Sequence, residues 1–291
     1  MTAPRVLAEG LHFGEAPRWR EGRLWFSDFY DHAVKTVDLV GRVEVAVEVP
    51  GQPSGLGWLP DGSLLVVSML DRRVLRLVDD QLVVHADLSE VATFHCNDMV
   101  VDAMGRAYVG NFGFDLHAEV ARRGFRSMVL DHPLADLALV HPDGQIRIAA
   151  RGIDFPNGCV VTPDGTTLIM AETLGQRLTA FRIGADGTLS DRRVFAELPR
   201  RSPDGICLDA DGAIWVADAM RNECVCVADG GEVLDVVFTD ELCFACALGG
   251  PDGRTLFMLT APAPQVEVAS RARDGRILIT EVEVPLAGHR S

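Results

Sequence analysis

The sequence of 291 residues predicts an all-β fold, a single six-bladed β-propeller domain over residues 1–291 with four antiparallel strands per blade. Three observations predict this fold. Two apolar runs around a turn that ends in Gly recur six times, the turn glycines recur at nearly constant intervals, and helical periodicity is scarce. Repeats of about 40–45 residues with four short strands each are typical of propellers.

Each repeat is centred on a predicted hairpin. Its apolar runs are rich in Val, Leu, Ile, Phe and Trp, and Gly stands where a tight turn needs a positive φ. The hairpins span residues 17–29, 57–69, 100–112, 160–172, 207–219 and 248–260. The turn glycines, with spacings of 40, 43, 60, 47 and 41 residues, are Gly22, Gly62, Gly105, Gly165, Gly212 and Gly253. Residues 33–49 and 73–88 fit the outer strand pairs of the first two blades.

The spacing of 60 residues indicates an insertion of about 17 residues after Asn111. We expect this insertion at about residues 115–136, with a short helix in it, near the mouth of the central channel. A surface excursion without function is the alternative. A propeller must also join its first and last strands, because open sheet edges are a liability. We expect residues 5–10 and 276–286 to share the sixth blade.

The charge and composition limit the partners. Lys and Arg number 27 against 42 Asp and Glu, which gives a formal net charge of −15. A polyanion would be repelled, so we expect a small-molecule substrate and neither nucleic acid nor a membrane as partner. Monomer and dimer both stay open. The N-terminal segment lacks the signal-peptide pattern, and seven scattered cysteines suit reduced thiols, so we expect a cytoplasmic protein.

Position within the repeat predicts position in space. Seven to eight residues before each turn Gly, the chain should enter the innermost strand of the blade, at the rim of the channel. The six residues at this position, five of them polar, are Glu15, Ser54, Asn97, Asn157, Asp204 and Ala245. Two carboxylates in a narrow channel repel each other, and a bound cation removes that conflict. Capping of loops or binding of channel waters is the alternative explanation.

The donor types at these positions indicate which cation would bind. Carboxylate and carboxamide oxygens without His or Cys favour one divalent ion among Ca²⁺, Mg²⁺ and Mn²⁺, with Zn²⁺ and Fe²⁺ as less favoured alternatives.

Four segments resemble the motifs of the gluconolactonase/regucalcin (senescence marker protein) family of six-bladed propeller lactonases. They are GEAPRW around Glu15, HCNDMVVDAMGRAYVGN around Asn97, FPNG around Asn157 and SPDG around Asp204. The resemblance covers nearly the whole chain. It implies lactone hydrolysis, a divalent metal ion held by Glu15, Asn157 and Asp204, and Asp204 as general base. Asn97 matches a residue that contacts the substrate or completes the metal shell.

The chain departs from this family near the channel mouth. Members that act on sugar lactones typically carry Arg two residues before the Asn-Asp pair, where this chain has His95. The insertion adds Phe114, Phe125 and Met128 close by. These changes make the mouth less polar and favour an apolar or aromatic substrate over a sugar lactone. The predicted substrate contacts are Asn97, His95, Asn111 and Phe112.

The sequence therefore predicts a divalent-metal-dependent hydrolase, with a lactonase as the favoured hypothesis. The ion would polarise the ring carbonyl, and Asp204 would accept a proton from the attacking water. The alternatives are a metal-assisted lyase or isomerase on the same scaffold and a non-catalytic calcium-binding propeller, because a fold does not dictate its chemistry. No G-x-S-x-G elbow surrounds Ser54, which argues against a covalent serine mechanism.

Overall fold

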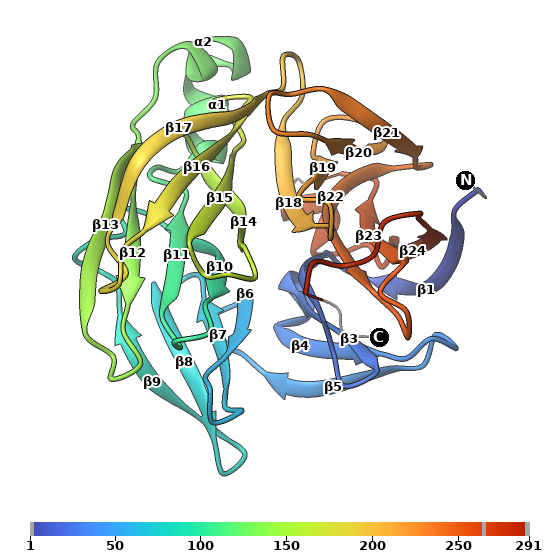
Figure 1. Ribbon diagram of the computed structural model, residues 1–291, viewed down its shortest axis with the longest axis horizontal. Coiled ribbons are helices and arrows are strands. Elements are labelled where there is room, and N and C mark those ends of the chain that lie inside the picture. Colours follow the sequence, from blue (N-terminus) through green and yellow to red (C-terminus); the bar gives the residue numbers. More distant parts are fainter. Residues whose placement is uncertain (1–2, 264–265, 289–291) are drawn as a thin grey trace.

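The computed structural model describes residues 3–263 and 266–288. Within these ranges, six four-stranded sheets stand around a central axis as the blades of a propeller (Figure 1). All neighbouring strands within a blade are antiparallel, for example β2 with β3 and β3 with β4. The predicted six-bladed β-propeller is confirmed.

In the first five blades, the strands follow the chain from the axis outwards. Blade 1 contains β2 (Gly14–Arg20), β3 (Arg23–Asp28), β4 (Ala33–Val37) and β5 (Val43–Glu48). Blade 2 contains β6 (Pro53–Trp58), β7 (Leu64–Ser68), β8 (Arg73–Val78) and β9 (Gln81–Asp87). Blade 3 contains β10 (Cys96–Val101), β11 (Ala107–Asn111), β12 (Ala135–Val140) and β13 (Ile146–Ile153). Blade 4 contains β14 (Pro156–Val161), β15 (Thr167–Glu172), β16 (Arg177–Ile183) and β17 (Leu189–Glu197). Blade 5 contains β18 (Pro203–Leu208), β19 (Ile214–Asp218), β20 (Glu223–Val227) and β21 (Val233–Phe238).

The sixth blade joins the two ends of the chain. It contains β22 (Leu242–Gly249), β23 (Thr255–Ala261), β24 (Gly275–Glu281) and, at its outer edge, β1 (Arg5–Leu11). β1 runs antiparallel to β24, with Arg5 opposite Ile279 and Leu11 opposite Gly275. The expected sharing of this blade is confirmed, although β24 ends at Glu281 and Leu286 instead forms a bridge to Asp209.

The turn glycines have the conformation that the repeat predicts. All six have φ between 71° and 87°, the left-handed region that a Cβ atom disfavours. Each lies between the two innermost strands of its blade, so every predicted hairpin is an inner strand pair. The predicted outer pairs at 33–49 and 73–88 are β4–β5 and β8–β9.

Apolar side chains fill the gaps between adjacent blades. Between blades 1 and 2, Val34, Leu56 and Val66 are buried in one cluster. Between blades 4 and 5, Ala171 and Val216 belong to another. This packing places the core in a ring around the axis, because each sheet buries both faces. The innermost strands are thereby fixed around a channel.

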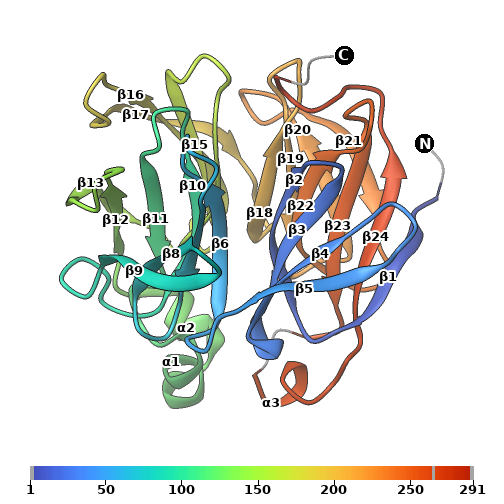
Figure 2. The ribbon, with the colours of Figure 1, turned by 90° about the horizontal axis from the view of Figure 1, so that it is seen from below.

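β11 and β12 are connected by residues 112–134, which contain helices α1 (Leu116–Arg123) and α2 (Phe125–Leu130). Asp115 is the N-cap of α1, and its Oδ1 accepts a hydrogen bond from Ala118 N at 2.9 Å. These helices lie at the same end of the propeller as α3 (Val266–Ala269) (Figure 2). In the described ranges, no helix has the length and hydropathy needed to cross a membrane.

The helical segment is attached to blade 4 by packing and by a polar contact. Met128 is fully buried against Phe114 and Phe155. His132 Nε2 lies 2.8 Å from Asp154 Oδ1, and His132 Nδ1 lies 3.1 Å from the Met128 carbonyl oxygen. These contacts hold α1 and α2 over one end of the channel.

Candidate metal and substrate site

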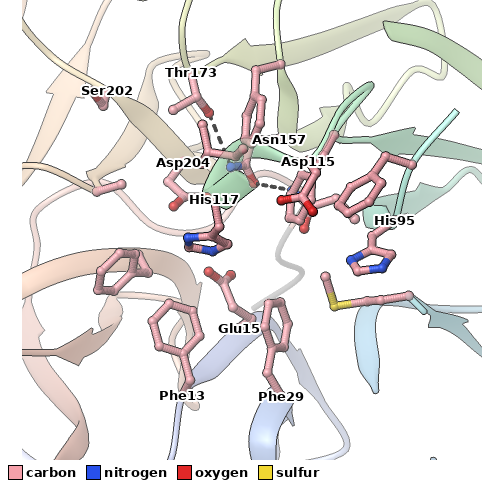
Figure 3. A pocket seen from close by; sticks show the side chains of 18 of the residues that line it. Phe13, Glu15, Phe29, His95, Asp115, His117, Asn157, Thr173, Ser202 and Asp204 are labelled. Atoms are coloured by element: carbon pink, nitrogen blue, oxygen red, sulfur yellow. Dashed lines mark hydrogen bonds between the residues drawn. The ribbon is translucent and has the colours of Figure 1, made fainter. Parts of the chain in front are cut away.

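A cavity of about 620 Å³ opens at the end of the channel where the innermost strands begin. Its polar floor contains Glu15, Asn97, Asn157 and Asp204. Figure 3 shows the side chains of Glu15, Asn157 and Asp204 pointing into one space from different blades. The structure therefore brings together four of the five polar residues that the repeat places around the axis, and Ser54 does not line the cavity.

The backbone explains why these side chains converge. Glu15, Asn97, Asn157 and Asp204 are each the second residue of an innermost strand. In each blade, the pairing of this strand with the next shifts register just after that point. An irregularity of this kind bends the strand and redirects a side chain. The polar residues thus leave the regular alternation of the sheet and face the cavity.

Two of these strands approach so closely at the axis that the next residue must be Gly. A Cβ on Gly158 would lie 2.6 Å from Ile206 N, and one on Gly205 would lie 2.6 Å from Ala245 Cα. Real Cβ atoms do not make such contacts. The N-G and D-G pairs therefore place a functional side chain and permit close packing of neighbouring blades.

A chain of hydrogen bonds fixes the orientation of the amides. The Thr173 hydroxyl donates to the Pro203 carbonyl oxygen at 2.7 Å, so it accepts from Asn157 Nδ2 at 3.2 Å. Asn157 Oδ1 is thereby turned the other way, where it accepts from Asn97 Nδ2 at 3.1 Å. The Ser54 hydroxyl donates to Asn97 Oδ1 at 3.3 Å. In this arrangement Asn157 Oδ1 faces Asn97, and the Asn157 side chain also hydrogen-bonds Asp204, an interaction that lowers the pKa of Asp204.

The two carboxyl groups are held in an environment that disfavours their charged forms. Burial, then the negative charges of Asp204 and Asp98, raises the pKa of Glu15 well above its usual value. Burial, then Asp98 and Asp218, raises the pKa of Asp204 well above its usual value. Among the residues that line the cavity there is no Lys or Arg. Neither carboxylate is therefore paired with a Lys or Arg side chain in the described cavity wall.

The donor set fits a hard divalent cation. Glu15 and Asp204 supply carboxylate oxygens and Asn157 supplies an oriented amide oxygen, which are the donors that such cations prefer. Within the described part of the chain, no group of three His, Cys, Asp or Glu side chains is arranged to hold a metal ion. That finding is compatible with this set, because only two of its three members belong to those residue types.

Residues 13–262 match the family model described as SMP-30/Gluconolactonase/LRE-like region. The chain belongs to this family. Regucalcin of Xenopus laevis is 24% identical over 264 residues, which cover 88% of this chain and 85% of the relative. The 6-deoxy-6-sulfogluconolactonase of Pseudomonas putida is 24% identical over 296 residues, which cover 98% and 96%. A solved calcium-binding protein, regucalcin of Agrobacterium tumefaciens, has a TM-score of 0.76 at 21% identity and covers 98% of this chain and 97% of its own.

The substrate contacts predicted for this gluconolactonase-family chain are only partly assembled. His95, Asn97 and Phe112 line the cavity. Asn111 does not. Its Nδ2 donates to the Asp136 carbonyl oxygen at 2.8 Å and its Oδ1 accepts from Gly113 N at 3.0 Å. The Asn111 side chain therefore organises the backbone where the helical segment leaves and rejoins the blade.

His95 packs against an aromatic neighbour. Its ring stacks on Phe94, with centroids 4.0 Å apart and an interplanar angle of 24°. Burial lowers the pKa of His95, Asp115 opposes this effect, and Arg72 adds to it. The imidazole is consequently neutral at pH 7 and presents one donor and one acceptor to the cavity.

Several cavity residues were not predicted from the sequence. Asp115 and His117 line the cavity from the helical segment, and Figure 3 shows His117 beside Glu15 and Asp204. Phe125 also lines the cavity, whereas Phe114 and Met128 lie behind the wall, where they pack in one cluster with the lining residue Phe155. Other lining residues are apolar and lie just before the innermost strands. Because they stand outside the strands, the repeat of the strands did not predict them. Those that line the cavity include Phe13, Phe94 and Phe155.

Proposed function

We propose that this protein is a divalent-metal-dependent lactonase. One observation carries the proposal. Two buried carboxylates, Glu15 and Asp204, face the same cavity as the oriented amide of Asn157, and the described lining of that cavity contains no Lys or Arg. A protein that leaves like charges together in this way gains most when a cation binds between them. The names of the relatives, a lactonase and a calcium-binding protein, support the same assignment.

The proposed ligands are Glu15, Asn157 and Asp204, and Ca²⁺, Mg²⁺ and Mn²⁺ are the favoured ions. Three protein ligands leave coordination positions for water and substrate. When bound, such an ion supplies Lewis-acid polarisation of a carbonyl oxygen and charge that stabilises a developing oxyanion. Thr173 contributes indirectly, because its hydroxyl accepts a hydrogen bond from Asn157 Nδ2 and so fixes the orientation of that amide.

The remaining steps are assigned to residues of the chain. Asp204 has two carboxylate oxygens, so ligation through one leaves the other to accept a proton from the attacking water. Asn97 uses one amide hydrogen toward Asn157, and its second hydrogen is free to orient the substrate. His95 and Phe112 bind the body of the substrate. α1 and α2 partly cover the cavity and limit the access of water.

A reducing compartment fits the cysteines. Cys96, Cys159 and the five others are buried free thiols, compatible with the predicted cytoplasmic location.

The proposal is tested by proton release from a panel of sugar, aliphatic and aromatic lactones. The protein is first stripped of metal with a chelator, and Ca²⁺, Mg²⁺, Mn²⁺, Zn²⁺ and Fe²⁺ are added back singly. Metal-restored hydrolysis of at least one lactone, lost in Asp204→Ala, is the expected result. Metal binding without turnover of any lactone overturns it and favours a lyase, an isomerase or a calcium-binding module.

A further inference from the structure

The walls of the cavity are rich in aromatic side chains. Eight of the lining residues are Phe or Tyr, namely Phe13, Phe29, Tyr30, Phe94, Phe112, Phe125, Phe155 and Phe244. Phe112 and Phe155 stack in parallel, with centroids 5.0 Å apart and an interplanar angle of 9°. On another side, the rings of Phe13 and Phe244 pack together with their centroids 4.6 Å apart. A flat apolar ligand finds ring faces and edges on more than one wall.

Three exposed apolar side chains surround the mouth. Leu70, Phe125 and Met220 line the cavity, yet they are 45%, 48% and 56% exposed. They come from blade 2, the helical segment and blade 5, so they surround the opening rather than form one local patch. Exposed apolar groups that converge on a concave site mark a ligand-binding surface.

Polar or charged side chains are the minority of the lining, ten of 24 residues, and three of them are hydrogen-bonded to one another. Asn97, Asn157 and Thr173 form one hydrogen-bonded chain at the floor. A polyhydroxylated ring would need a partner for each hydroxyl that it removes from water, and phenyl walls supply none. The volume of about 620 Å³ lies within the range of roughly 300–1,000 Å³ typical of drug-sized ligands.

The described lining of the cavity also lacks a Lys or Arg side chain that would hold an anion. Its lining contains the carboxylates Glu15, Asp115 and Asp204 and no Lys or Arg. Arg18 does not line the cavity, because it donates to Asp98 Oδ1 and to the Met99 carbonyl oxygen. Asp98 lies close enough to raise the pKa values of Glu15 and Asp204. A dication offsets Glu15 and Asp204 but leaves Asp115. The protein's net charge of −15 repels anions further.

We propose that the substrate is an aromatic or fused-ring lactone that carries no negative charge, and that anionic lactones and small sugar lactones are poor substrates. This proposal rests on the lactonase function proposed above. The apolar walls hold the aromatic body, and the carboxylates reject a substrate carboxylate. Neutral bodies are accepted because they pack against the aromatic faces. Cationic bodies are also accepted because the aromatic faces and Asp115 favour positive charge.

The test compares matched substrates with the Ca²⁺-loaded protein. They are dihydrocoumarin, its 6-carboxy and 6-aminomethyl derivatives, and glucono-1,5-lactone. We expect kcat/KM for the neutral and aminomethyl compounds to exceed that for the carboxylate and for the sugar lactone by at least about tenfold. Faster turnover of the sugar lactone or of the carboxylate overturns the proposal.

Variants locate the effect in the cavity. Phe125→Ala should lower kcat/KM for dihydrocoumarin about fivefold to tenfold. Met220→Arg should raise the carboxylate's kcat/KM relative to the neutral lactone by about tenfold. Phe238→Ala is the matched control, because Phe238 is 71% exposed on β21 and does not line the cavity. An unchanged selectivity in Met220→Arg contradicts the proposed charge discrimination.

A binding measurement separates this proposal from the lactonase assignment. Isothermal calorimetry compares 2-naphthylmethanol, 2-naphthylmethylammonium and 2-naphthoate, none of which can be hydrolysed. If no lactone is turned over with any metal, the lactonase assignment fails, and the calorimetric order then decides the ligand class. Tighter binding of the neutral and cationic naphthyl compounds supports the class, and tighter binding of the naphthoate overturns it.

Discussion

Arg18 Nη2 lies 3.1 Å from Asp98 Oδ1 and 2.7 Å from the Met99 carbonyl oxygen, which joins the innermost strands of blades 1 and 3. Asp98 is also close enough to raise the pKa values of Glu15 and Asp204. Arg18 therefore neutralises the third carboxylate of the channel, and the two that face the cavity are left for a cation.

Removal of the Arg18 guanidinium should destabilise the fold. Arg18→Met leaves the nearly buried carboxylate of Asp98 without its partner, and we expect a loss of about 2–3 kcal/mol in the free energy of unfolding. This value is below the usual cost for a buried pair because the Arg18 side chain is 23% exposed. Urea denaturation measures the change. Arg18→Met with Asp98→Asn should recover most of the stability, and a double variant as unstable as Arg18→Met would show that the charge is not the cause.

The metal-free protein should lose stability as the pH rises. The pKa values of Glu15 and Asp204 are raised in the folded state, mainly by burial, so the folded state binds more protons than the unfolded state. The stabilisation is present at low pH and is lost upward from about pH 4.5. Thermal melting in chelator from pH 4.5 to 8 measures this slope. Glu15→Gln should flatten it and raise stability at pH 8 by about 1 kcal/mol.

Binding of a divalent ion should reverse that loss. At a free Ca²⁺ concentration of about 100 times Kd, the expected stabilisation is about 2.7 kcal/mol. Asp204→Ala should abolish both this stabilisation and the metal-restored turnover, with a loss of at least about 10³-fold. Asp274→Ala is the control, because Asp274 is exposed and lies outside the cavity. An Asp204→Ala protein that still melts higher with Ca²⁺ argues against this ligand set.

His95 should control both the acid limb of activity and selectivity. Burial lowers the pKa of His95, so the ring gains its proton only below about pH 6.5. His95→Asn should remove the change in kcat/KM that accompanies this protonation and leave the profile above pH 7 flat. His95→Arg should raise the turnover of glucono-1,5-lactone relative to dihydrocoumarin by about tenfold. Unchanged kinetics in both variants would remove His95 from the site.

Closure of the ring should depend on β1. Deletion of residues 1–8 removes most of the strand that pairs with β24 and exposes the outer face of blade 6. Because Leu7 and Ala8 belong to the apolar cluster shared by blades 6 and 1, we expect a sharp fall in Tm. Differential scanning calorimetry measures it. Val40→Ala serves as a control, since Val40 is 82% exposed, and an equal Tm for the deletion and the intact chain would contradict the proposed role.

The sequence was sufficient to predict the architecture and the floor of the site, because both follow from the repeat. A Gly with positive φ recurs in each hairpin, and the register irregularity recurs at the start of each innermost strand. Glu15 and Asp204 could therefore be superposed before any coordinates were known. The roles of the individual site residues stay predictions.

The walls could not be predicted because they belong to no repeat. Phe13 precedes its innermost strand, and His117 lies on a helix that only one blade carries. Asn111 shows the opposite problem. It stands at a polar position near the mouth, but its amide is used by two backbone groups, which no spacing in the sequence reveals. The Arg18–Asp98 contact spans 80 residues and two blades, so it also required the coordinates.

The register irregularity of the innermost strands belongs to the backbone, whereas the chemistry of the cavity floor belongs to the side chains that this backbone carries. A shift of the backbone register occurs near the start of the innermost strand in all six blades, but only in blades 1, 3, 4 and 5 does the residue at this position line the cavity. In blade 6 the shift precedes Ala245 and the neighbouring Phe244 lines the cavity, and in blade 2 the Ser54 hydroxyl donates a hydrogen bond to Asn97 instead of lining the cavity. The chemistry of the cavity floor can therefore change by substitution of one of these side chains at a time, while the hairpins and the contacts between blades stay as they are.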